Sequence, residues 1–381
     1  MFRYFFGIFL FICPACAQSP VDYVDPFIGT GAYAGVSRWG AQGGTYPGAV
    51  VPHGMVQITP ETRHSAGGHG YYYQDSTIHC FSFLDHLSGF PEGSAGRFKM
   101  MPVCDSSISS TFHHNNEMAQ PGFYSVQLSS GIKFECTTTS HCGFCSIGFP
   151  KSGQPQLVFY DISEIIAQDQ SSISGRCQNY YYTIQFNTPI LSAEKNGKQT
   201  IVGFSQKNHL LCKTGFSTRG VAEATANLQA EIPDWQFDAT RQNARRSWEN
   251  LLGHVQVKGG SEQQKTIFYS ALYHSFLLPM LVSDHHESEP RYNAFSPWDT
   301  YQTVHPLLTL LQPQQHGEML AGLVNESARM GHFPGFAMAG NHIIAVLADA
   351  WAKGIRRFDL QKAYALAQNT MLDSALCMAA Y

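Results

Sequence analysis

The spacing of apolar residues changes along the chain, from a two-residue period to a helical one, near residue 233. Residues 124–128 and 132–136 each alternate apolar with polar positions, and Ser129, Ser130 and Gly131 separate the two runs. This pattern predicts a β-hairpin with one face in water. Similar runs between clusters of Gly, Pro, Asn and Ser occur at 156–160, 180–186 and 198–204. Together these runs predict an antiparallel β-sandwich.

Downstream of residue 233 the apolar positions follow a helical period. Ser261 and Gln264 form a capping box, which predicts a helix that begins after Ser261. Pro313 can open a further helix and Gly331 can end it. Two more helices are expected, at 341–353 and 359–377. A row of amphipathic helices with short connections predicts a curved array or toroid of helical hairpins.

The first 17 residues are typical of a secretory signal peptide. Arg3 precedes a short apolar run at 4–12, and small residues at 15–17 suit cleavage after Ala17. The apolar run is too short to span a bilayer. We expect a secreted or periplasmic protein; a lipid anchor at Cys16 is the less favoured alternative.

Composition narrows the class of function. The chain has 381 residues, 44% of them hydrophobic, 14% charged and 13% aromatic, with a formal net charge of −4. It can bury two substantial cores, and it has no excess of basic residues for nucleic acid. A neutral polar ligand such as a carbohydrate would suit this composition, although secreted all-β domains show the same bias without a ligand. The pairing of the cysteines cannot be assigned from their spacing, and the Cys142 and Cys145 spacing, without a second pair, does not predict a zinc site.

Residues 292–313 are the densest block of aromatic, carboxylate and imidazole residues. Trp298 offers a flat face for the C–H groups of a pyranose, and Asp299 can accept two hydroxyl hydrogen bonds. The alternatives are that Trp298 is a core residue and that Asp299 caps a helix.

Several segments in order along the chain resemble glycoside hydrolase family 92, the exo-acting α-mannosidases. The matching stretches are DPFIGTG at 25–31, GTYPGAVVPHGMVQ at 44–57, HLSG at 86–89, PGFYSV at 121–126, KTIFY at 265–269 and WDT at 298–300. The resemblance runs from about residue 22 to the end of the chain.

The resemblance implies a multi-domain fold: an antiparallel β-sandwich (supersandwich) followed by the first part of an (α/α)6 helical barrel. The expected domains are a signal peptide at 1–17, a sandwich at 18–232, a linker helix at 233–260 and an incomplete barrel at 261–381. It further implies removal of terminal α-linked mannose from glycans such as N-glycans, in the manner of an α-1,2-mannosidase. The reaction would proceed with inversion and a bound Ca²⁺.

The family parallel also suggests residues that contact the sugar. These are Asp299, Trp298, Asp85, His86, His69, Arg38, Trp39, Asn341 and His342. Asp85 and His86 could instead order a Gly-rich loop, Arg38 and Trp39 could form a loop tip, and Asn341 could cap a helix. His53, by contrast, is expected to tighten a turn.

The chain departs from the family because it ends at Tyr381. The resemblance implies that the catalytic acid and base, and the calcium ligands, lie beyond that residue, so none is assigned here. Residues 340–344 also look shorter than the corresponding family segment. Three interpretations follow: part of an active mannosidase, a non-catalytic carbohydrate-binding sandwich, or an inactive fragment.

Overall fold

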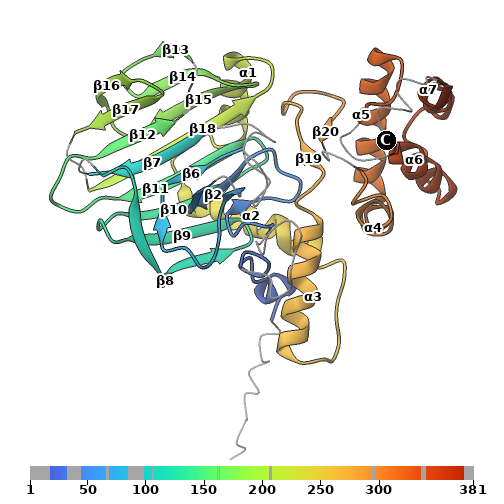
Figure 1. Ribbon diagram of the computed structural model, residues 1–381, viewed down its shortest axis with the longest axis horizontal. Helices are drawn as coiled ribbons and strands as arrows, with labels where there is room; N and C mark the ends of the chain where they lie inside the picture. The colour runs from blue at the N-terminus through green and yellow to red at the C-terminus, as the bar shows by residue number, and fades with distance from the viewer. Residues whose placement is uncertain are drawn as a thin grey trace, which may run out of the picture.

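The computed structural model describes residues 18–31, 44–65, 68–84, 98–104, 107–160, 162, 164–205, 208–293, 297–335 and 340–372. Figure 1 shows a large β-structure at one end of the molecule, the helix α3 below it, and a group of helices at the other end. This arrangement confirms the predicted order of an antiparallel β-sandwich followed by helices.

The sandwich consists of two antiparallel sheets. One has seven strands in the order β1-β2-β6-β7-β12-β17-β16, and the other has nine in the order β13-β14-β15-β18-β11-β10-β9-β8-β5. The strands of the first sheet are β1 (Ala49–Val50), β2 (Gln57–Glu61), β6 (Cys80–Ser82), β7 (Lys99–Val103), β12 (Gln156–Tyr160), β16 (Ile190–Asn196) and β17 (Gln199–Phe204). Those of the second are β5 (Thr77–Ile78), β8 (Ser110–Gln120), β9 (Phe123–Leu128), β10 (Lys133–Thr138), β11 (Cys142–Gly148), β13 (Glu164–Gln168), β14 (Ser172–Cys177), β15 (Tyr180–Phe186) and β18 (His209–Ser217). Two short pairs stand apart: β3 (Arg63–Ser65) with β4 (Gly68–Gly70), and β19 (Met280–Leu281) with β20 (Tyr292–Asn293).

Alternation of side chains explains the sandwich core. In the predicted hairpin, β9 and β10 pair with Phe134 opposite Val126. Both residues point inward and are buried with the apolar residues of the facing sheet, where Phe81 stacks on Phe134. Gly131, at φ +86°, makes the turn between the two strands, a conformation that favours glycine. Burial on one face of each sheet therefore fixes the register.

Helices follow the sandwich. A 3₁₀ turn, η1 (Pro20–Tyr23), precedes it, and the helices are α1 (Val221–Glu231), α2 (Phe237–Leu252), α3 (Glu262–Ser275), α4 (Val304–Leu311), α5 (Pro313–Met330), α6 (His342–Ala352) and α7 (Leu360–Leu372). The capping box of Ser261 and Gln264 begins α3, and Gly331, in the left-handed conformation, ends α5, as predicted. None of the described helices is long and apolar enough to cross a membrane.

Two apolar clusters connect the parts of the fold. The first joins η1, β1, α2, α3 and α4 around Trp248, which is fully buried and donates from Nε1 to the Val50 carbonyl at 2.7 Å. The second packs α5, α6 and α7 together. His53 adds a polar link, since its ring contacts the Pro279 carbonyl at 2.8 Å and Gln312 at 3.1 Å. His53 has φ of 54° within a turn, as expected from the sequence.

Candidate functional site

The turn that precedes α4 exposes the two residues singled out in the sequence. Trp298 is 44% exposed and Asp299 is also exposed, so the interpretation of Trp298 as a core residue is wrong. Thr303 stands at the N-cap of α4, and its hydroxyl donates to the Asp299 carbonyl at 3.0 Å. Within the described ranges, no hydrogen bond or ion pair engages the Asp299 carboxylate, so this carboxylate does not cap α4. An unpaired carboxylate beside an exposed indole is available to a ligand.

The start of α6 lies against the same turn. The ring of His342 contacts that of Tyr301, with centroids 4.4 Å apart and planes inclined by 40°. Asn341 is the N-cap residue of α6, but its side chain does not cap the helix; its Nδ2 donates to the Pro334 carbonyl at 3.4 Å. Its Oδ1 is buried and has no partner among the described residues. The fold thus brings together two predicted segments that are about 40 residues apart in the chain.

A cavity of about 170 Å³ lies next to this turn. Its lining is mostly apolar, with Pro297, Leu323 and Ile343 among the contributors, and Asn293 and His305 add polar groups. Apolar walls with a few convergent polar groups are typical of small-molecule sites. The described cysteines are not joined in disulfides, and none of them lines this cavity.

A hydrogen-bonded chain fixes the protonation of His305. The Thr309 hydroxyl donates its one hydrogen to the His305 carbonyl at 3.1 Å, so it accepts from Nδ1 of His316 at 2.9 Å. Burial keeps the His316 ring neutral, so its Nε2 carries no proton and accepts from Nδ1 of His305 at 3.1 Å. Nε2 of His305 is left with a lone pair and no proton. Burial lowers the pKa of His305 to about 4, and burial together with the nearby His305 lowers that of His316 to about 3.

Five other predicted contact residues cannot be placed as side chains. Arg38, Trp39, Asp85 and His86 lie outside the described residues, and for His69 only the backbone is described, in β4 opposite His64. Their assignment to the sugar site stays a prediction.

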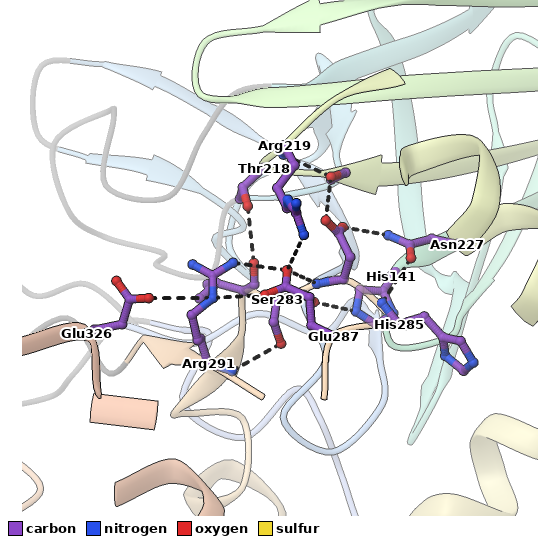
Figure 2. A network of polar contacts seen from close by, with 12 residues as sticks. His141, Thr218, Arg219, Asn227, Ser283, His285, Glu287, Arg291 and Glu326 are labelled. Atoms are coloured by element: carbon purple, nitrogen blue, oxygen red, sulfur yellow. Dashed lines mark hydrogen bonds and ion pairs between the residues drawn. The ribbon is translucent and has the colours of Figure 1, made fainter. Parts of the chain in front are cut away.

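A polar network that the sequence did not reveal joins the sandwich to the helices (Figure 2). At its centre is Asp284, only 3% exposed, which accepts from the Ser217 hydroxyl and the Asn227 amide, each at 2.9 Å. Asn227 also accepts from the backbone N–H of His285 at 3.0 Å. The residues come from β18, α1 and the segment before β20, and no local spacing links them.

The same network contains a buried ion pair. His141 donates from Nδ1 to Glu231 Oε1 and from Nε2 to the Ser283 carbonyl, the latter at 2.7 Å. Both acceptors lack hydrogens, so the ring must carry both protons and a positive charge. Burial opposes this charge, but the hydrogen bond and charge of Glu231 outweigh burial and raise the pKa of His141. The pKa of Glu231 is correspondingly lowered, because the bonds from His141 and Thr139 outweigh the effect of burial.

His141, Glu231 and His285 are also the group of possible metal ligands found within the described residues. Calcium prefers six to eight oxygen ligands, and this group offers two imidazoles and one carboxylate. The first imidazole is moreover committed to donating hydrogen bonds. The group therefore does not fit Ca²⁺, and no step of a reaction is assigned to that ion here.

A second cavity, of about 340 Å³, lies where this network meets α5. Its charged groups are paired: Arg291 contacts Glu287 at 3.1 Å and Glu326 at 3.7 Å (Figure 2). Arg329 also contacts Glu326, at 2.8 Å. The ion pair of Arg291 with Glu326 joins the segment between β19 and β20 to α5.

An exposed indole, an unpaired carboxylate and neutral imidazole and amide groups are suited to a sugar, and a sandwich followed by helices supports them. Groups of these kinds are typical of proteins that bind carbohydrate. Comparison with family models gives the particular family: residues 23–223 match the glycosyl hydrolase family 92 N-terminal domain and residues 223–376 match the family 92 catalytic domain. The chain belongs to glycosyl hydrolase family 92.

Individual relatives agree with this family. The family 92 inverting mannosidase of Bacteroides thetaiotaomicron superposes with a TM-score of 0.83 at 26% identity, over 95% of this chain and 56% of that one. An α-mannosidase of the same organism gives a TM-score of 0.81 at 24% identity, over 94% and 57% of the two chains, which shows the fold. An uncharacterized secreted glycosidase of Arthroderma benhamiae is 23% identical over 87% of this chain and 49% of its own length. The chain thus spans about half the length of the relatives it matches.

Proposed function

We propose that this chain binds a terminal α-linked mannose and forms part of an exo-acting α-mannosidase. The observation that carries the proposal is the exposed Trp298 and Asp299 pair beside the cavity, with no bond to the Asp299 carboxylate within the described ranges. Solved relatives named as mannosidases support the choice of sugar.

The chemistry of the turn suits a pyranose. Asp299 can accept hydrogen bonds from two adjacent hydroxyls, and Trp298 can pack on the apolar face of the ring. The unprotonated Nε2 of His305 would accept a third hydroxyl where the cavity reaches it. Asp299 is given a binding role, and the two carboxyl groups that inversion requires on opposite faces of the sugar are not assigned to residues of this chain.

Inversion, a requirement for Ca²⁺ and preference for α-1,2 linkages remain parts of the proposal that rest on the family. Export rests on the predicted signal peptide, and the relative of Arthroderma benhamiae is named as secreted. The substrate would be a neutral mannose-containing glycan met outside the cytoplasm.

The test is calorimetric titration of the chain with α-1,2-mannobiose, with and without Ca²⁺, alongside an assay for released mannose. Asp299→Asn should weaken binding about 10- to 100-fold, since hydrogen bonds to a charged group contribute about 1.5–3 kcal/mol. Asp238→Asn is the matched control, because Asp238 is an exposed aspartate on α2.

Outcomes separate the interpretations. Binding that is lost in Asp299→Asn and kept in Asp238→Asn supports the site, and mannose release then decides between an enzyme and a binding module. Equal affinity of Asp299→Asn and the unaltered chain would contradict the role of the turn.

A further inference from the structure

A groove of about 480 Å³ lies on the sandwich, apart from the turn before α4. It is lined by the β13–β14 turn, the end of β15, the loop that follows β15, and Trp235 of the segment between α1 and α2. In Figure 1 the strands β14 and β15 lie in the sandwich, at the other end of the molecule from α5, α6 and α7. The groove is therefore separate from the site proposed above.

The strand register shows how the floor of the groove is built. Gln185 of β15 pairs with Ser172 of β14 on one side and with Lys213 of β18 on the other. Residues paired in this way point to the same face of a sheet, and Ile184 and Phe186, which flank Gln185, point into the core. Ser172, Gln185 and Lys213 thus form a row on the outer face, about 10 Å long at the usual spacing of strands.

Trp235 stands at one end of this row and is held in place. Lys213 lies 4.4 Å from the centre of the indole ring and donates to the carbonyls of Ile232 at 2.9 Å and Asp234 at 3.4 Å. The Phe144 ring meets the indole at 6.2 Å and 65°. Trp235 nevertheless remains 36% exposed. A ligand would therefore meet a rigid aromatic surface, with little loss of side-chain freedom on binding.

The polar groups of the groove are mostly neutral. Asn187 accepts the N–H of Leu211 with Oδ1 at 2.9 Å, which leaves its Nδ2 free to donate. Within the described ranges, no hydrogen bond engages the side-chain amides of Gln170 and Gln185. Each amide supplies donors and an acceptor, as adjacent sugar hydroxyls require.

The one charged side chain in the lining is Asp169. Its Oδ1 accepts the N–H groups of Ser171 and Ser172, each at 2.7 Å, and the bond from Ser171 in particular lowers the pKa of this carboxyl. Asp169 therefore stays ionised, and the residues that line the groove include no cation, since the neighbouring Lys213 is buried against Trp235. An anionic ligand is disfavoured, and a neutral one is not.

We propose that this groove is a second carbohydrate-binding site, which takes a neutral hexopyranose chain with one ring packed on Trp235 and its hydroxyls bonded to Gln185 and Asn187. The site holds glycan on the sandwich and has no part in bond cleavage. This inference does not depend on the mannose site at Asp299.

The test is NMR titration of the whole chain with linear mannotriose and, separately, cellotriose, followed through the indole N–H signals. Trp235→Phe identifies the Trp235 signal. That signal should shift and saturate with a Kd on the order of 1 mM, as expected for an open site with few contacts. Gln185→Ala should weaken binding at this signal about 5-fold while leaving the melting temperature unchanged, since one neutral hydrogen bond contributes about 1 kcal/mol.

The controls keep the two sites distinct. Trp298→Ala should leave the Trp235 titration unchanged, and Trp235→Phe should leave binding at Trp298 unchanged. A saturable Trp235 shift with either trisaccharide, weakened in Gln185→Ala, supports the groove. A Trp235 signal that does not move with either sugar, or that moves equally in Gln185→Ala, overturns the inference, even if mannose binds at Trp298.

Discussion

Replacing Glu231 by Gln should strongly destabilise the fold, because it removes the negative partner of a buried cation. The side chains of His141 and Glu231 are 3% and 10% exposed, respectively. Glu231 accepts from Nδ1 of His141, from the backbone N–H of His141 at 3.0 Å, and from the Thr139 hydroxyl. All three groups donate, whereas the amide of Gln has only one accepting oxygen.

The magnitude follows from that mismatch. A buried donor that faces the new NH₂ group costs about 1–3 kcal/mol. Removing one partner of a buried ion pair typically costs about 3–5 kcal/mol in total, and we expect Glu231→Gln to fall in this range. The matched control is Glu249→Gln. Glu249 pairs with Arg245 at 3.0 Å, but both side chains are about one-third exposed, so its loss should cost about 0–1 kcal/mol.

The effect should also depend on pH. The raised pKa of His141 stabilises the fold fully below its ordinary value of 6.5, and this contribution declines as pH rises through the folded pKa. The lowered pKa of Glu231 stabilises the fold fully above its ordinary value of 4.5, and this contribution declines as pH falls through the folded pKa. The difference in the free energy of unfolding between the unaltered chain and Glu231→Gln should therefore be largest between about pH 4.5 and pH 6.5.

The assay is urea unfolding followed by the β-sheet circular dichroism signal, at about pH 5.5 and at about pH 9. The expected result is a lower midpoint for Glu231→Gln, with a larger difference at the lower pH. A loss no greater than that of Glu249→Gln, or a difference equal at both pH values, would refute the description of His141 as a buried imidazolium.

Three further predictions test other parts of the structure. ¹⁵N NMR should show His305 and His316 both protonated at Nδ1, with neither ring titrating between about pH 5 and 8. Because their pKa values are lowered in the folded state, the stability that they contribute should fall as pH drops below 6.5. Titration of either ring between about pH 5 and 8 would disprove the hydrogen-bonded chain. Lys99→Met should lower the free energy of unfolding by about 3–5 kcal/mol, measured by urea unfolding. The change removes the ammonium that pairs with the buried Glu61 carboxylate at 2.6 Å. A loss below about 1 kcal/mol would contradict the importance of this ion pair. Gly122→Ala should lower the melting temperature, because Gly122 has φ of +81° and a new Cβ would lie 2.7 Å from a side-chain atom of α2; an unchanged melting temperature would show that α2 can shift.

Local sequence signals were sufficient for many elements. The alternation at 124–128 and 132–136 gave a hairpin that the structure confirms as β9 and β10. The capping box at Ser261 and the glycine at 331 predicted the start of α3 and the end of α5. These signals are reliable because they depend on backbone groups and side chains a few residues apart.

The exposed state of Trp298 could not be read from the sequence. An indole beside a helix start is compatible with a core position, and only the packing of the α6 start against Tyr301 shows what surrounds the turn. The groove at Trp235 was missed for a similar reason. Its floor joins residues of β14, β15 and β18, and alternation tells which residues share a face but not which strands are neighbours.

The sequence by itself determined the family, the succession of strands and helices, and the block of residues that contains Trp298 and Asp299, because each is written in short contiguous segments. Only the tertiary structure decided the strand order, the pairing of His141 with Glu231 and the separation of the two proposed sugar sites. His141 and Glu231 are 90 residues apart, and neither has a local feature that distinguishes it from a surface residue. Their charges can persist in the interior only because the fold places each within reach of the other.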